Sequence, residues 1–195
     1  MPQRSSIAHM ALLACALSAV LAACSTGPSA PRALLNEHTG VTINAVSEPI
    51  VFARVRDDNL THECVTLVAA EKDEAGKYTE LLLLYRWTLS AHGDAHAPLP
   101  RDAGRLQIDV DGRAIELQPL SQLPIAASEL KNLFPPTAGD YVSYAYRTEF
   151  ATMQQIASSH DLSVHLPQET PDLAFSLWRD GRPALAELLK QLNGS

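Results

Sequence analysis

The sequence predicts an α+β protein that is mainly β: an antiparallel β-sandwich or half-barrel with two or three short helices, one of them C-terminal. Three observations support this fold class. Several short segments alternate apolar and polar residues, which is the period of a half-buried strand. Turn sequences such as Asp111-Gly112 separate neighbouring segments by only a few residues, as hairpins require. Apolar residues recur at helical spacing in only a few places.

The strands can be placed from these patterns. The run Leu81–Leu84 is apolar without alternation, so its strand should be buried on both faces and lie at the centre of the core. Turn composition at 73–77 predicts a hairpin between that strand and the one before it. Asp111-Gly112 suits a two-residue hairpin turn because both positions tolerate positive φ. We expect strands at 41–46, 50–55, 63–70, 78–89, 105–110, 113–117, 141–147, 162–166 and 173–178.

Two helices are predicted in the C-terminal part, at 149–158 and 183–192, where apolar residues follow helical spacing. Thr148 is a suitable N-cap for the first, and Pro183 suits the first turn of the second. A short third helix at 126–134 would end before two prolines, which cannot continue a helix.

The N-terminus has the three parts of a secretory signal. Arg4 precedes the apolar run 11–21, and small residues follow that run. The run is too short for a transmembrane helix, which needs about 20 apolar residues. Leu21-Ala22-Ala23-Cys24 resembles the lipobox of bacterial lipoprotein precursors. The alternatives are an ordinary signal peptide with a coincidental cysteine, or lipidation at Cys15, whose apolar run is shorter.

The resemblance to lipoprotein precursors implies that Cys24 becomes the lipidated first residue of the mature protein. Two or more acyl chains, such as palmitate, anchor a protein stably where one does not. Ser25 follows instead of the aspartate that often retains such proteins in the inner membrane. We therefore expect a cell-envelope protein on the inner leaflet of the outer membrane, facing the periplasm. The expected organisation is a signal peptide at 1–23, a flexible tether at 24–36 and a single domain at 37–195.

Charge and cysteine content narrow the functional classes. The net charge of −7 becomes about −8 once the signal peptide with Arg4 is removed, which argues against nucleic acid as a partner. With Cys15 removed and Cys24 acylated, Cys64 is the one remaining cysteine, so no intramolecular disulfide can form. The apolar surroundings of Cys64 favour a buried structural thiol over a reactive one.

No motif predicts a catalytic, metal or cofactor site. His92 and His96 flank Asp94 in a segment of loop composition, where this spacing imposes no common direction. His160 and His165 flank a predicted strand and should point to opposite faces. Ser128 and Lys131 have the Ser-x-x-Lys spacing of penicillin-interacting enzymes, but the companion motifs are absent.

Aromatic residues occur in three of the predicted strands, at 78–89, 141–147 and 173–178, and this placement favours sheet packing over an exposed binding surface. They are Trp87, Tyr141, Tyr144, Tyr146 and Trp178.

The expected function is that of a membrane-anchored binding or assembly module without enzymatic activity. Its expected partners are the membrane, through the acyl chains on Cys24, and an envelope protein that could add a strand to a sheet edge. The alternative is a small periplasmic hydrolase or ligand-binding domain acting on cell-wall or lipid components, which would need a deep pocket lined by polar groups.

Overall fold

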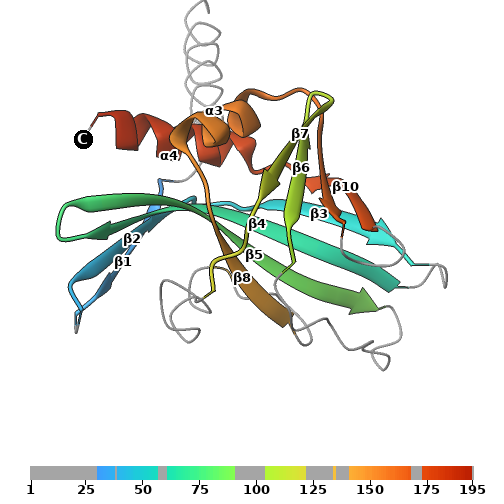
Figure 1. Ribbon diagram of the computed structural model, residues 1–195, viewed down its shortest axis with the longest axis horizontal. Coiled ribbons are helices and arrows are strands. Elements are labelled where there is room, and N and C mark those ends of the chain that lie inside the picture. Colours follow the sequence, from blue (N-terminus) through green and yellow to red (C-terminus); the bar gives the residue numbers. More distant parts are fainter. Residues whose placement is uncertain are drawn as a thin grey trace, which may run out of the picture.

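The computed structural model describes residues 30–37, 39–56, 61–90, 104–121, 134, 141–167 and 173–194. Within these residues the protein is mainly β, with one antiparallel sheet and two helices, the second of them at the C-terminal end (Figure 1). The strands are β1 (Arg32–Asn36), β2 (Val41–Ala45), β3 (Ile50–Val55), β4 (Thr61–Glu74), β5 (Lys77–Ser90), β6 (Leu106–Val110), β7 (Arg113–Leu117), β8 (Tyr141–Arg147), β9 (Leu162–Leu166) and β10 (Leu173–Arg179). The helices are α3 (Phe150–Ser158) and α4 (Arg182–Asn193).

The long hairpin of β4 and β5 is the centre of the sheet. The two strands pair along their whole length around the turn Ala75-Gly76, where φ is positive at both positions. All residues from Leu81 to Thr88 are buried. The predicted central strand, buried on both faces, is therefore confirmed. The turn is tighter than its composition suggested, because Asp73 accepts the N–H of Gly76 at 2.8 Å and β4 continues to Glu74.

β2 and β3 lie one after the other along the same edge of β4. Ala45 pairs with Ala70 and Ile50 with Leu67, so four residues between β2 and β3 oppose only two of β4. This is a bulge, which bends the strand locally. It divides what would otherwise be one long strand, and Pro49 lies within it.

The remaining strands extend the sheet on both sides of the central hairpin. Next to β3 follow β10, β9, β6 and β7, while β8 pairs with the other edge of β5. The segment after β7 approaches β8: Pro119 bridges Tyr146, and the N–H of Leu120 donates to the carbonyl of Ala145 at 2.7 Å. The sheet thus curls until its two ends touch, but this short contact does not close it.

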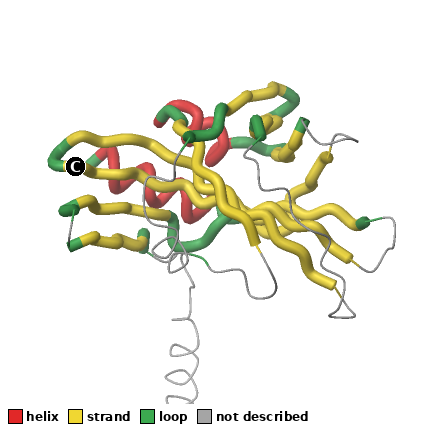
Figure 2. Tube along the Cα trace, turned by 60° about the horizontal axis from the view of Figure 1, so that its bottom comes forward, coloured by secondary structure: helices red, strands yellow, loops and turns green. Residues whose placement is uncertain are grey.

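The two helices pack on each other and on one face of the curved sheet (Figure 2). α3 buries Met153 and Ile156, and α4 buries a stripe that includes Leu185 and Leu188. Full burial of each such side chain stabilises the fold by about 1.5–3 kcal/mol. The predicted helices at 149–158 and 183–192 are confirmed, whereas most of the helix expected at 126–134 lies outside the described residues.

Two local predictions were wrong. The N-cap of α3 is Glu149, not Thr148, because Thr148 is buried and its N–H donates to the carbonyl of Glu80 in β5. Regular structure also begins earlier than expected, since β1 occupies residues assigned to the tether. Leu34 of β1 pairs with Ile43 and packs against the core, so apolar residues within the supposed tether belong to the sheet.

Candidate functional site

The candidate site lies near the end of the sheet opposite the β4–β5 turn. The helices cover the sheet nearer to that turn, so the ends of β3, β4 and β5 extend beyond them (Figure 1). Successive residues of β4 point to opposite faces of the sheet. His62 and Glu63 therefore begin two different clusters, one on each face.

On one face, a group of side chains that we call the aromatic patch comprises Val55, His62, Trp87 and Trp178. The ring of Trp178 stacks on His62 with centroids 6.1 Å apart and lies 6.4 Å from the ring of Trp87. Val55 pairs with His62 in register. Trp178 and Val55 are 54% and 51% exposed, whereas Trp87 is 8% exposed. The patch is thus a surface of exposed apolar side chains resting on a buried indole.

The positions of the patch residues are fixed by the surrounding sheet. The pairing of β10 with β3 shifts between Leu177 and Arg179, and this irregularity brings the intervening Trp178 over the patch. The buried indole N–H of Trp87 donates to the hydroxyl of Thr66 at 3.0 Å, which holds the ring in place. Because these contacts exist without a partner, binding here would need little further ordering.

The three tyrosines do not form one surface with the tryptophans. Tyr141 packs beside Trp87, but Tyr144 lies three residues further along the strand and so on the other face. Tyr146 is fully buried, and its hydroxyl donates to the carbonyl of Gly104 at 3.0 Å. Burial raises the pKa of Tyr146 above its usual value. Sheet packing thus accounts for Tyr146, while Trp178 is the more exposed of the two tryptophans.

On the opposite face, a group that we call the arginine cluster comprises Arg54, Arg56, Arg86 and Glu63. The guanidinium Nε of Arg54 donates to Glu63 Oε2 at 2.8 Å, and a terminal nitrogen of Arg86 lies 3.6 Å from the same oxygen. A terminal nitrogen of Arg56 lies 3.7 Å from Oε1. The side chains of Glu63 and Arg86 are 9% and 6% exposed, while those of Arg54 and Arg56 are 28% and 33% exposed.

Cys64 is buried next to the aromatic patch, in one cluster with Val51 and Trp87. Burial, together with the negative charge of Glu63, raises the pKa of its thiol to about 12. Since the thiolate is the reactive form, the raised pKa and the burial of Cys64 both favour a structural thiol over a reactive one. The predicted burial of Cys64 is confirmed.

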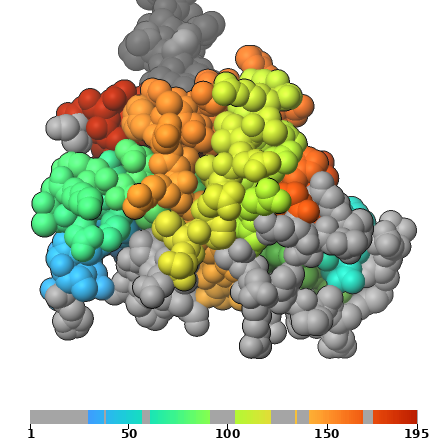
Figure 3. Space-filling view, viewed as in Figure 1, coloured from blue at the N-terminus to red at the C-terminus, as the bar shows by residue number. Residues whose placement is uncertain are grey.

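The Asp111-Gly112 turn is confirmed, and it has a second role. The carboxylate of Asp111 accepts the backbone N–H groups of Asp161 and His160, each at 2.8 Å, and these bonds lower its pKa. They join the tip of the β6–β7 hairpin to the loop between α3 and β9, and Figure 3 shows the two segments side by side. Asp111 therefore has a structural role in the fold.

An acid–imidazole contact lies elsewhere on the sheet, between β6 and β9. His165 Nε2 is 3.0 Å from Asp109 Oδ2, and the amide of Gln107 donates to Asp109 Oδ1 at 3.0 Å. His160 lies outside β9, in the preceding bend, so it does not join this contact. The pair connects two neighbouring strands, and we assign it a structural role.

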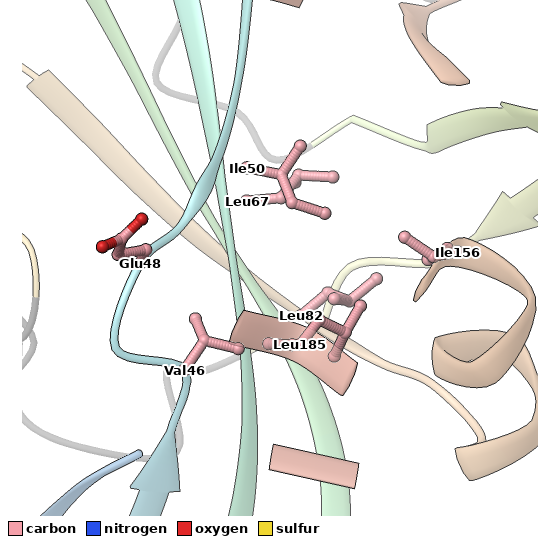
Figure 4. A pocket seen from close by; sticks show the side chains of 8 residues that line it. Val46, Glu48, Ile50, Leu67, Leu82, Ile156 and Leu185 are labelled. Carbon is pink, nitrogen blue, oxygen red and sulfur yellow. The ribbon is translucent and has the colours of Figure 1, made fainter. Parts of the chain in front are cut away.

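A cavity between the helices and the sheet is too small for a substrate. It measures about 10 Å³ and is lined almost entirely by apolar side chains, with Glu48 at its margin (Figure 4). This volume admits at most about one water molecule, whereas ligand pockets measure about 300–1,000 Å³. The cavity gives no support to a hydrolase or ligand-binding domain.

Several predicted positions lie outside the described residues: Cys24, His92, Asp94, His96, Ser128 and Lys131. Among the residues that are described, no group of three or more His, Cys, Asp or Glu side chains could hold a metal ion. Nor does any helix in this part of the chain have the length and apolar character to cross a membrane. Comparison of the chain with protein-family models, curated proteins and solved structures finds no match.

Proposed function

We propose that the protein is a membrane-anchored lipoprotein of the bacterial cell envelope whose domain faces the periplasm and binds another envelope protein without catalysis. The lipobox-like sequence ending at Cys24 supports the anchor and the location on the outer membrane. The aromatic patch supports the binding role. We also infer that the architecture is a half-barrel, because a single curled sheet carries both helices on one face.

The exposure of Trp178 carries this proposal. Tryptophan is enriched among the residues that dominate binding energy at protein interfaces, where truncation costs about 2 kcal/mol or more. Trp178 leaves more than half of its surface in solvent although it already rests on His62 and Trp87. A protein partner that covered Trp178 and Val55 would remove both apolar side chains from water.

Addition of a strand to a sheet edge, the mode expected from the sequence, would use a different surface. Among the described strands, β1 pairs only with β2 and so forms one edge of the sheet. A contact through β1 would not depend on Trp178, which allows the two modes to be separated experimentally.

The test is crosslinking in intact cells, with a photoreactive amino acid in place of Val55. We expect a discrete adduct with one envelope protein, and we expect Trp178→Ala in the same chain to weaken it about 30-fold in affinity. Tyr78→Ala is the matched control, because Tyr78 is 59% exposed but lies beside the β4–β5 turn, far from the patch. An adduct unaffected by Trp178→Ala would reject the patch as the contact.

The anchor is tested separately by mass spectrometry of the protein purified from membranes. We expect a mature chain that begins at Cys24 and carries acyl chains, and Cys24→Ser should abolish the modification and membrane retention. A mature chain that begins at another residue would reject the lipoprotein assignment.

A further inference from the structure

We propose that Glu71 and Glu80, flanked by Asn44 and Thr148, form a binding site for a calcium ion. We call these four residues the polar row, because they follow one another across β2, β4, β5 and the residue after β8. The row lies near the β4–β5 turn, at the end of the sheet away from the aromatic patch. The site is therefore separate from the proposed contact with a protein partner.

The first argument is register. Asn44 pairs with Glu71, and Glu71 pairs with Glu80. The N–H of Thr148 donates to the carbonyl of Glu80 at 3.1 Å, which continues the pairing of β8 with β5 by one residue. Directly opposite residues of antiparallel strands carry their side chains on the same face. The row is on the face that carries the helices, since Ala69, two residues before Glu71, lines the cavity between helices and sheet.

The second argument is the opposition of two carboxylates. Because the carbonyl of Glu80 points toward Thr148, Glu80 forms a non-hydrogen-bonded pair with Glu71, the type of pair in which side chains are closer. Like charges directly opposite each other destabilise a sheet. Burial raises the pKa of Glu71, the hydrogen bond from Asn44 lowers it, and the charges of Glu80 and Asp73 raise it further. A cation between the two carboxylates would replace this repulsion by attraction.

The basic residues of the adjoining strands do not supply that cation. Lys72, Lys77 and Arg147 each occupy a register position on the other face of the sheet. Lys72 is also paired with Glu74 at 2.6 Å. Within the described part of the chain, neither carboxylate of the polar row forms an ion pair.

The third argument is an unsatisfied hydroxyl group. Thr148 is only 5% exposed, and its Oγ1 has no hydrogen-bond partner among the described residues. A buried hydroxyl group that is left unpaired is costly, and such a group is commonly satisfied by a water molecule or an ion. The register places this hydroxyl on the same face as Glu80. A bound ion, or a water molecule held by it, would provide the missing partner.

The fourth argument is the chemistry of the donors. Calcium binds about 6–8 oxygen ligands, from carboxylates, amide carbonyls and water, in a flexible geometry. Each carboxylate of the row can offer both of its oxygens, while Asn44 and Thr148 can complete the shell directly or through water. The Asn44 amide, whose Nδ2 lies 3.5 Å from Glu71 Oε1, can turn its oxygen toward the ion. Asn44 and Glu80 are half-buried, so an ion can enter from solvent.

The direct test is calorimetric titration of the chelator-treated full chain with calcium chloride in about 0.1 M salt, which screens weak surface binding. We expect saturable binding at one site with a Kd below about 1 mM, and Glu80→Gln should weaken it at least about tenfold. Glu74→Gln is the matched control. It removes the same charge from the same strand, but Glu74 is on the other face and its side chain is 57% exposed. We expect it to change the affinity less than about twofold.

Thr148→Val tests the hydroxyl group, because valine keeps the shape of the side chain. Calcium affinity should fall at least about threefold. In chelator, where no ion is bound, Tm should stay the same or rise, because an unpaired hydroxyl has been removed. A lower Tm in chelator would show that the hydroxyl has a partner within the protein and would overturn its role.

Three results would overturn the site as a whole or its assignment. Absence of saturable binding up to about 10 mM calcium would reject the site, since even weak calcium modules bind at about 0.1–1 mM. Equal weakening by Glu80→Gln and Glu74→Gln would show general attraction to an acidic surface. Magnesium requires a nearly ideal octahedral shell and gives up its water reluctantly, so it should bind more weakly, and tighter binding of magnesium would overturn the assignment to calcium.

Discussion

Gly181, which precedes α4, provides a direct test of how the helix is positioned on the sheet. A Cβ atom at this position would lie 2.5 Å from the backbone carbonyl carbon and oxygen of Pro49 and 2.8 Å from the carbonyl oxygen of Glu48. Pro49 and Glu48 belong to the bulge between β2 and β3. Favourable carbon contacts are about 3.5–4.0 Å, so Gly181→Ala must push the helix and the bulge apart by about 1 Å.

The expected cost of Gly181→Ala follows from this overlap. Overpacking costs about 1–3 kcal/mol, and the upper part of the range applies because backbone atoms cannot rotate away. Replacing glycine by alanine also restricts the unfolded chain, which offsets about 0.4–1 kcal/mol. The net destabilisation of about 2 kcal/mol corresponds to a Tm lower by roughly 4–8 °C for a chain of this size.

The assay is thermal and urea denaturation followed by circular dichroism. Gly194→Ala is the control, because a Cβ at the C-terminal end of α4 would meet nothing nearer than 3.5 Å. We expect its Tm to stay close to that of the wild type. A Tm for Gly181→Ala within about 1 °C of the wild type would refute the close approach of α4 to the bulge.

Three further predictions concern single side chains. Because the pKa of Asp111 is lower in the folded state, its charge stabilises the protein above the unfolded pKa of about 3.9, and this contribution disappears as the pH falls through the folded value. Asp111→Asn should therefore lower Tm at pH 7, and the difference from the wild type should shrink in acid; a constant difference would contradict this. Cys64 should react with a thiol reagent only after denaturation, and rapid labelling of the native protein would contradict its burial. Trp178→Phe should shift the fluorescence maximum to shorter wavelength, because the buried Trp87 then dominates the emission; an unchanged maximum would show that Trp178 is covered.

Local patterns predicted most of the strands, since each pattern depends on neighbours in the sequence. The strand at 162–166 has the same bounds as β9, and the hairpin around Asp111-Gly112 pairs as expected, with Val110 opposite Arg113. The strand β1 was not predicted, because the Ser- and Pro-rich segment before it dominates the local composition. The bulge at 46–49 could not be predicted, because it depends on a register with β4 that only the folded sheet defines.

The two clusters of the candidate site could not be recognised for a related reason. Arg54 and Glu63 belong to different strands, and Arg86 and Trp178 come from further along the chain, so no spacing in the sequence relates them. The aromatic residues were recorded individually, but which of them would be exposed depended on the order of the strands. Tyr146 became buried because the segment after β7 bridges to β8, and Trp178 remained exposed because it lies where the pairing with β3 shifts.

Three consecutive residues of β4 show that, once the order of the strands is known, the alternation of side chains along a strand determines which face of the sheet each residue occupies. His62 and Cys64 lie on one face with Trp87, and Glu63 between them lies on the other face with the arginines. A shift of one residue in the register of β4 would exchange the two faces and place a carboxylate under the aromatic patch. The register is held by apolar pairs further along the strand, such as Leu67 with Leu84 and Ala70 with Leu81. The buried centre of the hairpin therefore determines which chemistry each face presents to solvent at its end.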